Sequence, residues 1–186
     1  MNDIYYDLYR LTGKTGRFTF LKTFFSLRAF RFLVYFRWCQ NNDNSCRYYL
    51  GKVCGFFLHR KMSIEMPYSV KAGKGLLMIH PYSITFNSQA VVGENFTIMK
   101  GATIGNNISG RRQGSPVIGN NVYIGLNSTV VGGVKIGDDV MIAANTFVNF
   151  DVPNGALVIG SPGVIHLKEK ASEPYIKNSI CQISNL

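Results

Sequence analysis

Hydrophobic residues recur at every sixth position through the middle and later parts of the chain. An α-helix repeats every 3.6 residues and an exposed strand every two, so neither element explains a strict period of six. A triangular coil does explain it, because three short strands of one hexad each close one turn and point their first residue inward. The first places of the hexads hold Val92, Ile98, Ile104, Ile118, Ile124, Val130, Ile136, Ile142 and Val148. The fifth places hold Phe96, Ala102, Val122, Ser128, Val134, Val140, Thr146 and Val152.

This period predicts a mainly β fold, a parallel β-helix in which stacked coils bury a continuous column of aliphatic side chains. The second place of the hexads is often glycine, and we expect these glycines to form the corners because glycine tolerates tight turns. A sandwich of short strands with Gly-Asn turns is the alternative, but sandwich strands do not keep one six-residue phase. The second places hold Gly93, Gly105, Gly119, Gly125 and Gly137.

The net charge of +10 is concentrated in the first third of the 186-residue chain. Residues 1–61 hold eleven Lys and Arg against three Asp, a balance of +8, together with the single tryptophan and most of the phenylalanines. This change of composition places a boundary near residue 62. We therefore expect a basic, aromatic-rich helical segment over 1–61, the β-helix over 62–165 with a protruding loop over 106–116, and a tail over 166–186.

The basic segment is expected to form two helices, over 24–40 and 46–61. In the first of these, Phe32, Leu33 and Phe36 fall on one side, while basic and aromatic residues fall on the other. Two interpretations stay open: the segment packs against the coil and partner subunits, or it lies on an anionic membrane with aromatic side chains in the interface. Nucleic-acid binding is disfavoured, since the aromatic load is too dense and apolar for a phosphate-binding face.

The four cysteines form no CxxC pair and no metal-ligand spacing, so we expect buried, reduced thiols and no metal. No apolar run approaches the ~20 residues that span a bilayer, and no signal peptide precedes the domain. The sequence therefore predicts a cytoplasmic protein, with contact to the inner face of the membrane as the open alternative.

The hexad region also carries a series of specific motifs. They read GKGLLMIH at 73–80, GATIG at 101–105, PVIG at 116–119, DVP at 151–153 and VIGSP at 158–162. With these motifs, residues 60–165 resemble the hexapeptide-repeat acyltransferases with a left-handed parallel β-helix, and specifically their serine acetyltransferase-like branch. The resemblance implies a homotrimer that transfers an acetyl group from acetyl-CoA to a hydroxyl and uses no metal.

His80 aligns with the catalytic histidine of that family. The resemblance implies that its neutral imidazole takes the proton of the acceptor hydroxyl and returns it to the leaving thiolate, a general-base effect of about 10²- to 10⁴-fold. We also place His80 at the head of a hexad, followed by Phe86 and Val92, where a structural residue would be aliphatic. Glu65 stands fifteen residues before His80, where the family often has a carboxylate that orients the histidine.

For the CoA moiety, the resemblance carries over five positions of the coil and the closing motif: Gly105, Ala143, Ala144, Gly160 and Pro162. A basic residue usually follows that proline in the family; because Gly163 follows it here, we expect Lys168 to contact the nucleotide instead. In the loop, Arg111 and Arg112 are expected to meet an anionic acceptor or a CoA phosphate, with a solvated basic loop as the alternative. Backbone N–H groups around 101–105 are expected to hold the charge of the thioester oxygen.

The chain departs from the serine acetyltransferase pattern where the acceptor would bind. Ile79 stands where an acid precedes the histidine, and Gly114-Ser115 stand where an Arg-His pair ends the loop. A free amino acid needs partners for both of its charges, so we expect a different hydroxyl, on a sugar of a surface polysaccharide or its precursor. Serine acetylation for cysteine biosynthesis and a non-catalytic hexapeptide scaffold are the two alternatives.

Overall fold

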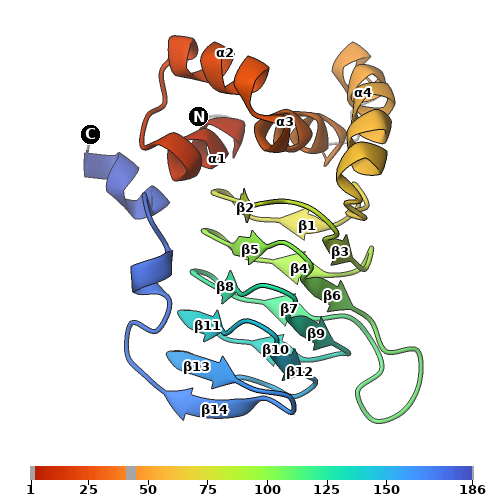
Figure 1. The fold of residues 1–186 in the computed structure, drawn as a ribbon, viewed down its shortest axis with the longest axis vertical. Helices are drawn as coiled ribbons and strands as arrows, with labels where there is room; N and C mark the ends of the chain where they lie inside the picture. The colour runs from red at the N-terminus through yellow and green to blue at the C-terminus, as the bar shows by residue number, and fades with distance from the viewer. Residues whose placement is uncertain (1–2, 41–44, 186) are drawn as a thin grey trace.

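A computed structural model describes residues 3–40 and 45–185 and shows a triangular prism of stacked coils with four helices on one end (Figure 1). The prism is the predicted left-handed parallel β-helix, which is thereby confirmed. After the last coil the chain turns back and runs along the prism toward the helices (Figure 1). The fold therefore has three parts: a helical head, a prism and a returning tail.

Each face of the prism is one sheet, and in each sheet the strands of successive coils pair with one another. The first sheet contains β1 (Lys71–Ala72), β4 (Val91–Val92), β7 (Val117–Ile118) and β10 (Lys135–Ile136). The second contains β2 (Leu77–Ile79), β5 (Thr97–Met99), β8 (Tyr123–Ile124), β11 (Val140–Ile142), β13 (Ala156–Ile159) and β14 (Val164–Leu167). The third contains β3 (Thr85–Phe86), β6 (Thr103–Gly105), β9 (Thr129–Val131) and β12 (Phe147–Val148). All pairings are parallel except that of β13 with β14, which is antiparallel and closes the far end of the prism.

The core of the prism follows the period of six. Every first-place and every fifth-place residue of the predicted hexads is buried, and Ile98, Ile104 and Ile124 are fully enclosed. The two polar fifth-place residues hydrogen-bond instead of disrupting the core; for example, the Ser128 hydroxyl donates to the Ala143 carbonyl oxygen at 2.6 Å. Burial of two residues in each hexad therefore stabilises the stack along its whole length.

The expectation that glycine forms the corners was wrong. The left-handed backbone conformation falls two places later in the hexad and is mostly taken by Asn or Asp, with φ near +55° at Asn95, Asn121 and Asp139. The second-place glycines serve close stacking instead. A Cβ atom added at Gly93 would lie 2.6 Å from the carbonyl oxygen of Gly119 in the next coil, a distance that no side chain tolerates.

The head consists of α1 (Asp3–Thr12), α2 (Arg17–Ser26), α3 (Arg28–Gln40) and α4 (Cys46–Met62). The single helix expected over 24–40 is divided, because Leu27 is extended and separates α2 from α3. The helix expected over 46–61 is α4, and Phe32, Leu33 and Phe36 of α3 are buried as predicted. Among the helices in the described ranges, none combines the length and apolarity needed to cross a bilayer.

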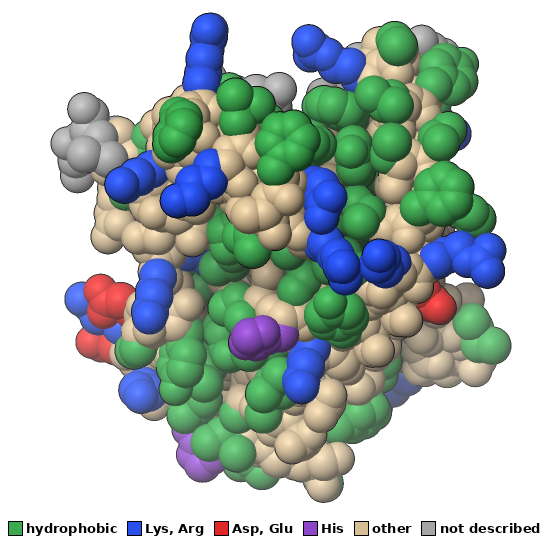
Figure 2. All heavy atoms as spheres, turned by 45° about the horizontal axis from the view of Figure 1, so that its top comes forward, with side chains coloured by type: hydrophobic (Ala, Val, Ile, Leu, Met, Phe, Trp, Pro, Cys, Tyr) green, Lys and Arg blue, Asp and Glu red, His purple; other side chains and the backbone are tan. Residues whose placement is uncertain are grey.

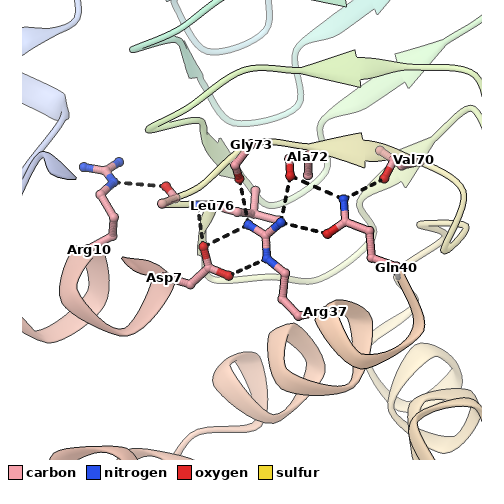
Figure 3. Close-up of polar contacts among 9 residues, drawn as sticks. Asp7, Arg10, Arg37, Gln40, Val70, Ala72, Gly73 and Leu76 are labelled. Atoms are coloured by element: carbon pink, nitrogen blue, oxygen red, sulfur yellow. Dashed lines mark hydrogen bonds and ion pairs between the residues drawn. The ribbon is translucent and has the colours of Figure 1, made fainter. Parts of the chain in front are cut away.

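A buried ion pair joins the head to the first coil (Figure 3). The Arg37 guanidinium donates to both carboxylate oxygens of Asp7, at 2.8 and 3.0 Å, and to the carbonyl oxygens of Ala72 and Gly73, each at 2.7 Å. Asp7 in turn accepts the backbone N–H of Leu76 at 2.8 Å. Burial raises the pKa of the Asp7 carboxyl, and the charge of Arg37 opposes that shift. The network orients α1 and α3 on the prism.

The tail over 166–186 showed no pattern in the sequence, yet its described residues have a defined path. After β14, the short 3-10 helices η1 (Glu173–Tyr175) and η2 (Ile180–Asn185) follow one edge of the prism back to the head. The Tyr175 ring lies 4.9 Å from that of Tyr123, and the backbone N–H of Ile180 donates to Asn95 Oδ1 at 3.0 Å. At the head, Arg10 of α1 hydrogen-bonds the carbonyl oxygen of Lys177.

Candidate functional site

His80 lies at the corner between the second and third sheets, directly after β2. In this coil Phe86 comes eight positions after the inward-facing Met78, whereas in the next coil Ile104 comes six positions after the equivalent Ile98. The corner of His80 therefore contains a two-residue insertion. The insertion carries the imidazole outward, and His80 is exposed.

The register argument used for His80 was wrong, because Met78 pairs with Ile98 and occupies the inward place. His80 instead has a φ of +50°, a left-handed conformation that costs a non-glycine residue on the order of 1 kcal/mol and is often found at functional sites. Its backbone is held in place: the His80 carbonyl oxygen accepts the Tyr82 N–H at 2.8 Å, and the Tyr82 carbonyl oxygen accepts the Gly101 N–H at 2.9 Å. The site thus presents an accessible ring on a fixed main chain.

Small residues occupy the same edge of the prism below His80. Ala143 and Ala144 follow β11, and Gly160 and Pro162 follow β13, so all four come at the end of a strand of the second sheet, as His80 does. Ala144 and Pro162 are exposed, and Ala143 and Gly160 are half-buried. Between them and His80 lie the corners after β5 and β8, which carry Lys100 and Leu126. The short side chains leave room for a thin, extended chain, such as a pantetheine arm, along the part of this edge farther from His80.

The other two predicted CoA residues lie elsewhere. Gly105 ends β6 at the opposite end of the third sheet, where it pairs with Val131. Lys168 follows β14, and its backbone N–H donates to the Gly155 carbonyl oxygen at 2.9 Å, just before β13 begins. The structure therefore brings four of the six predicted residues to the edge of His80 and separates Gly105 and Lys168 from them.

Glu65 precedes the first coil. It forms a parallel β-bridge with Thr85 at the start of β3 and so extends the third sheet beyond β3. Its side chain is exposed and lines a hollow of about 840 Å³ between α4 and the first coil, together with His59, Arg60, Tyr68 and other residues. Within the part of the chain that the structure describes, no hydrogen bond joins Glu65 to His80. The hollow was not predicted; the only signal for it in the sequence is the aromatic run of α4.

The loop over 106–116 holds the two predicted arginines at a second hollow of about 590 Å³, which faces Val131 and Phe147 of the third sheet. Arg112 forms an ion pair of 3.1 Å with Asp151, and both side chains are largely solvated. The pKa of Asp151 is lowered, first by the backbone N–H of Lys135 and then by Arg112. Arg111 is exposed and makes no ion pair with any described residue, so its charge is available to a ligand.

The expected donors for the thioester oxygen are already engaged. The backbone N–H groups of Gly101, Ala102 and Thr103 donate to carbonyl oxygens of Tyr82, Met99 and Ser128, respectively. They hold the coils together and are not free for an oxyanion. One chain therefore offers a histidine and a row of small residues at one end of the third sheet, and a basic loop at the other.

Comparison with known proteins agrees with this architecture. Residues 115–149 match the family model described as bacterial transferase hexapeptide (six repeats). The chain is 28% identical over 123 residues to a serine acetyltransferase of Helicobacter pylori, an alignment that covers 66% of this chain and 72% of the relative. It is 36% identical over 102 residues to a serine acetyltransferase of Staphylococcus aureus, covering 55% of this chain and 48% of the relative.

Solved structures give the same picture. The fold matches the Neisseria gonorrhoeae serine acetyltransferase in complex with serine with a TM-score of 0.68 and 26% identity, over 88% of this chain and 67% of that one. It matches a serine acetyltransferase in complex with CoA with a TM-score of 0.71 and 20% identity, over 88% of this chain and 68% of that one. The second likeness shows the fold alone.

These relatives overturn one expectation from the sequence. The acceptor was expected to be a sugar hydroxyl, but the similar proteins are serine acetyltransferases, so the alternative that named serine fits better. The error has a physical origin: Ile79 and Gly114-Ser115 lack the charges expected beside a bound amino acid. Their absence at two positions does not exclude charges supplied from others, such as Arg111.

Proposed function

We propose, because the chain is a serine acetyltransferase-like hexapeptide-repeat protein, that it transfers the acetyl group of acetyl-CoA to the hydroxyl of L-serine. The observation that carries the proposal is the placement of His80. Its ring stands exposed on an inserted, left-handed corner, at the head of an edge lined by small residues. A purely structural residue at this corner would not need an imidazole.

In the proposed reaction, His80 acts as the general base. Its neutral imidazole accepts the proton of the serine hydroxyl while the serine oxygen attacks the carbonyl carbon of the thioester. The C–O bond forms, the C–S bond breaks, and the imidazolium returns the proton to the CoA thiolate. Catalysis of this type contributes about 10²- to 10⁴-fold to the rate. Glu65 as the partner that orients His80 stays a prediction, because the two side chains are not hydrogen-bonded in the single chain.

We propose that the pantetheine arm of acetyl-CoA lies along the edge below His80. Ala143 and Ala144 leave space for it beside β11, and Gly160 and Pro162 do so beside β13. This path leads the thioester toward the imidazole. Roles for Gly105 and for Lys168 in holding the rest of the CoA molecule stay predictions, and they require a ligand that extends beyond this one edge.

For serine, we propose that Arg111 binds the carboxylate. Arg111 has no ion-pair partner among the residues that the structure describes, so its guanidinium is suited to a bidentate pair with a carboxylate, whereas Arg112 is already paired with Asp151. Arg111 and His80 lie at opposite ends of the third sheet in one chain. We therefore propose a homotrimer in which the loop of one copy lies beside the His80 edge of the next.

We also propose that the protein works in the cytoplasm, where its thiols stay reduced. Cys39, Cys46 and Cys54 are free thiols, which agrees with a reducing compartment. Only Cys39 of these three is buried, so the expectation of buried cysteines was too general.

Release of the CoA thiol from acetyl-CoA tests the proposal, with L-serine and a panel of free sugars as acceptors. We expect thiol release that depends on L-serine and does not occur with the sugars. His80→Ala should lower kcat by about 10²-fold or more, with an unchanged melting temperature. The matched control is His166→Ala, an exposed histidine of β14, which should keep full activity. A wild-type rate in His80→Ala, or no serine-dependent release by the wild type, would refute the assignment.

A further inference from the structure

One side of α4 packs closely on α3, and the opposite side carries an apolar stripe that faces solvent. Gly51 and Gly55 are buried, and a Cβ atom at Gly51 would lie 3.1 Å from the carbonyl oxygen of Tyr35. With 3.6 residues per turn, the outward side lies half a turn away from these glycines. That side holds five large hydrophobic residues that are 48 to 66% exposed, namely Tyr49, Leu50, Val53, Phe56 and Phe57.

The same arrangement occurs in α2. Thr23 is the buried residue of this helix and marks its inward side. On the outward side, Phe18, Leu21 and Phe25 follow one another at helical spacing and are 82, 55 and 74% exposed. A contiguous row of exposed large hydrophobic residues indicates a surface that binds a partner protein or a membrane. Single exposed hydrophobic residues are common and indicate nothing.

Basic residues flank both stripes, and acidic residues are scarce beside them: Glu65 shares a hollow with Lys52 and Phe56. In the described ranges 17–40 and 45–62 there is no Asp or Glu. Arg17 and Lys22 flank the stripe of α2, Lys52 and Lys61 flank that of α4, and Arg60 lies over the Phe56 ring at 5.5 Å; all five are exposed. Figure 2 looks onto this end of the molecule and shows hydrophobic and Lys or Arg side chains gathered over the helices.

We propose that the outward sides of α2 and α4 bind an anionic lipid surface, with the phenylalanines in the interface and the lysines and arginines against the headgroups. A second copy of this chain is a poor occupant, because two surfaces that each carry an excess of positive charge repel each other. Nucleic acid fits poorly as well, since Leu21, Leu50 and Val53 offer no ring on which a base can stack. The inference goes beyond the proposed reaction and does not depend on it.

Flotation of the full chain with lipid vesicles tests the inference. We expect binding to vesicles of phosphatidylcholine mixed with phosphatidylserine, and much weaker binding to phosphatidylcholine alone. The double variant Lys22→Gln/Arg60→Gln should bind roughly 30-fold more weakly, which corresponds to about 1 kcal/mol for each lost basic side chain. Phe18→Ser/Val53→Ser should weaken binding by about tenfold or more, because less apolar surface enters the interface.

Two control variants match these changes at sites away from the head. Lys135→Gln/Lys170→Gln removes the same charge from exposed positions of β10 and the tail, and Ile108→Ser/Leu167→Ser removes exposed hydrophobic residues of the loop and β14. Both should bind vesicles like the wild type. Equal binding of all four variants would overturn the proposal, as would equal binding to both kinds of vesicle.

Sedimentation velocity tests whether a second copy of this chain, instead of lipid, covers the surface. If Phe18→Ser/Val53→Ser lowers the oligomeric mass and leaves vesicle binding unchanged, the surface is an interface between copies and the proposal is wrong. An unchanged mass with weakened vesicle binding supports it. Serine-dependent thiol release is measured separately, so a failure of the lipid proposal is distinguishable from a failure of the reaction proposed above.

Discussion

At the scale of single residues, histidines of this chain show how environment decides what an imidazole can do. His80 stands on an exposed corner, where a ligand can reach its ring. His59 lies against the rings of Phe32 and Tyr68, at 4.9 and 5.5 Å between centroids, and its Nδ1 lies 2.7 Å from the carbonyl oxygen of Ile64. The first can serve as a base, whereas the second supports the end of α4.

The surroundings of His59 predict a loss of stability in mild acid. Burial lowers the pKa of His59, and its hydrogen bond to the Ile64 carbonyl opposes that shift. Because the folded pKa lies below the unfolded value of about 6.5, the unfolded chain takes up the proton first as the pH falls. The stability that the neutral ring contributes is therefore present above pH ~6.5 and decreases below it, until the pH passes the folded pKa.

Urea unfolding at a series of pH values on both sides of ~6.5 measures this effect. We expect His59→Gln to be less stable than the wild type above that pH and to lose part of the acid-induced decrease. His166→Gln, at an exposed position, should keep the decrease of the wild type. An identical pH dependence in His59→Gln and in the wild type would contradict the prediction.

At the scale of elements, the head and the prism are joined by the buried pair of Asp7 and Arg37, whose side chains are 0 and 3% exposed. The pair of Arg112 and Asp151 has a similar length, 3.1 against 2.8 Å, but lies in solvent. Removing one partner of a buried pair leaves an uncompensated charge, whereas water replaces a partner lost at the surface. Length alone therefore says little about the role of an ion pair.

Arg37→Met should lower the free energy of unfolding by about 3–5 kcal/mol, because Asp7 is left buried without its counter-charge. Arg112→Met, which removes the solvated pair, should change it by about 1 kcal/mol or less. Adding Asp7→Asn to Arg37→Met should cost much less than the sum of the two single changes. Urea unfolding measures the wild type, Arg37→Met, Asp7→Asn, their double variant and Arg112→Met. Equal losses in Arg37→Met and Arg112→Met would refute the argument from burial.

The elements with a strict period could be predicted from the sequence, and the irregular ones could not. The hexads identify the buried residues because each coil repeats the same geometry. The two-residue insertion before Phe86 breaks that phase, so counting back from it placed His80 inside a hexad that Met78 actually begins. The break at Leu27 and the path of the tail depend on tertiary contacts between distant parts of the chain, which local patterns do not reveal. The acceptor was predicted wrongly because absent charges were weighed more than the motifs themselves.

At the scale of the whole molecule, the proposed site needs more than one copy. His80 and Arg111 lie at opposite ends of the third sheet, so a chain that lacks one and a chain that lacks the other should complement each other in a mixed trimer. We expect His80→Ala and Arg111→Ala each to be severely impaired when pure. Co-refolded in equal amounts, they should recover up to roughly a quarter of wild-type activity. This is the share of interfaces at which one chain supplies an intact His80 and its neighbour an intact Arg111.

Thiol release with L-serine measures the recovery, and sedimentation equilibrium should give three times the 20.8 kDa of one chain. His80→Ala refolded alone in the same way is the control and should stay inactive. A mixture of the two variants that recovers nothing would refute a site shared between neighbouring copies.

The returning tail has a consequence for how the protein comes apart. A linear stack of coils ordinarily frays from its ends, since each coil touches only its neighbours. Here the last coil continues into a segment that Arg10 of the head and Asn95 of the second coil hold near the other end of the prism. The tail thereby connects the last coil to the head, so unfolding of the last coil must also break contacts at the head. Such a connection makes the unfolding of the coils more cooperative than it would be in a stack without the tail.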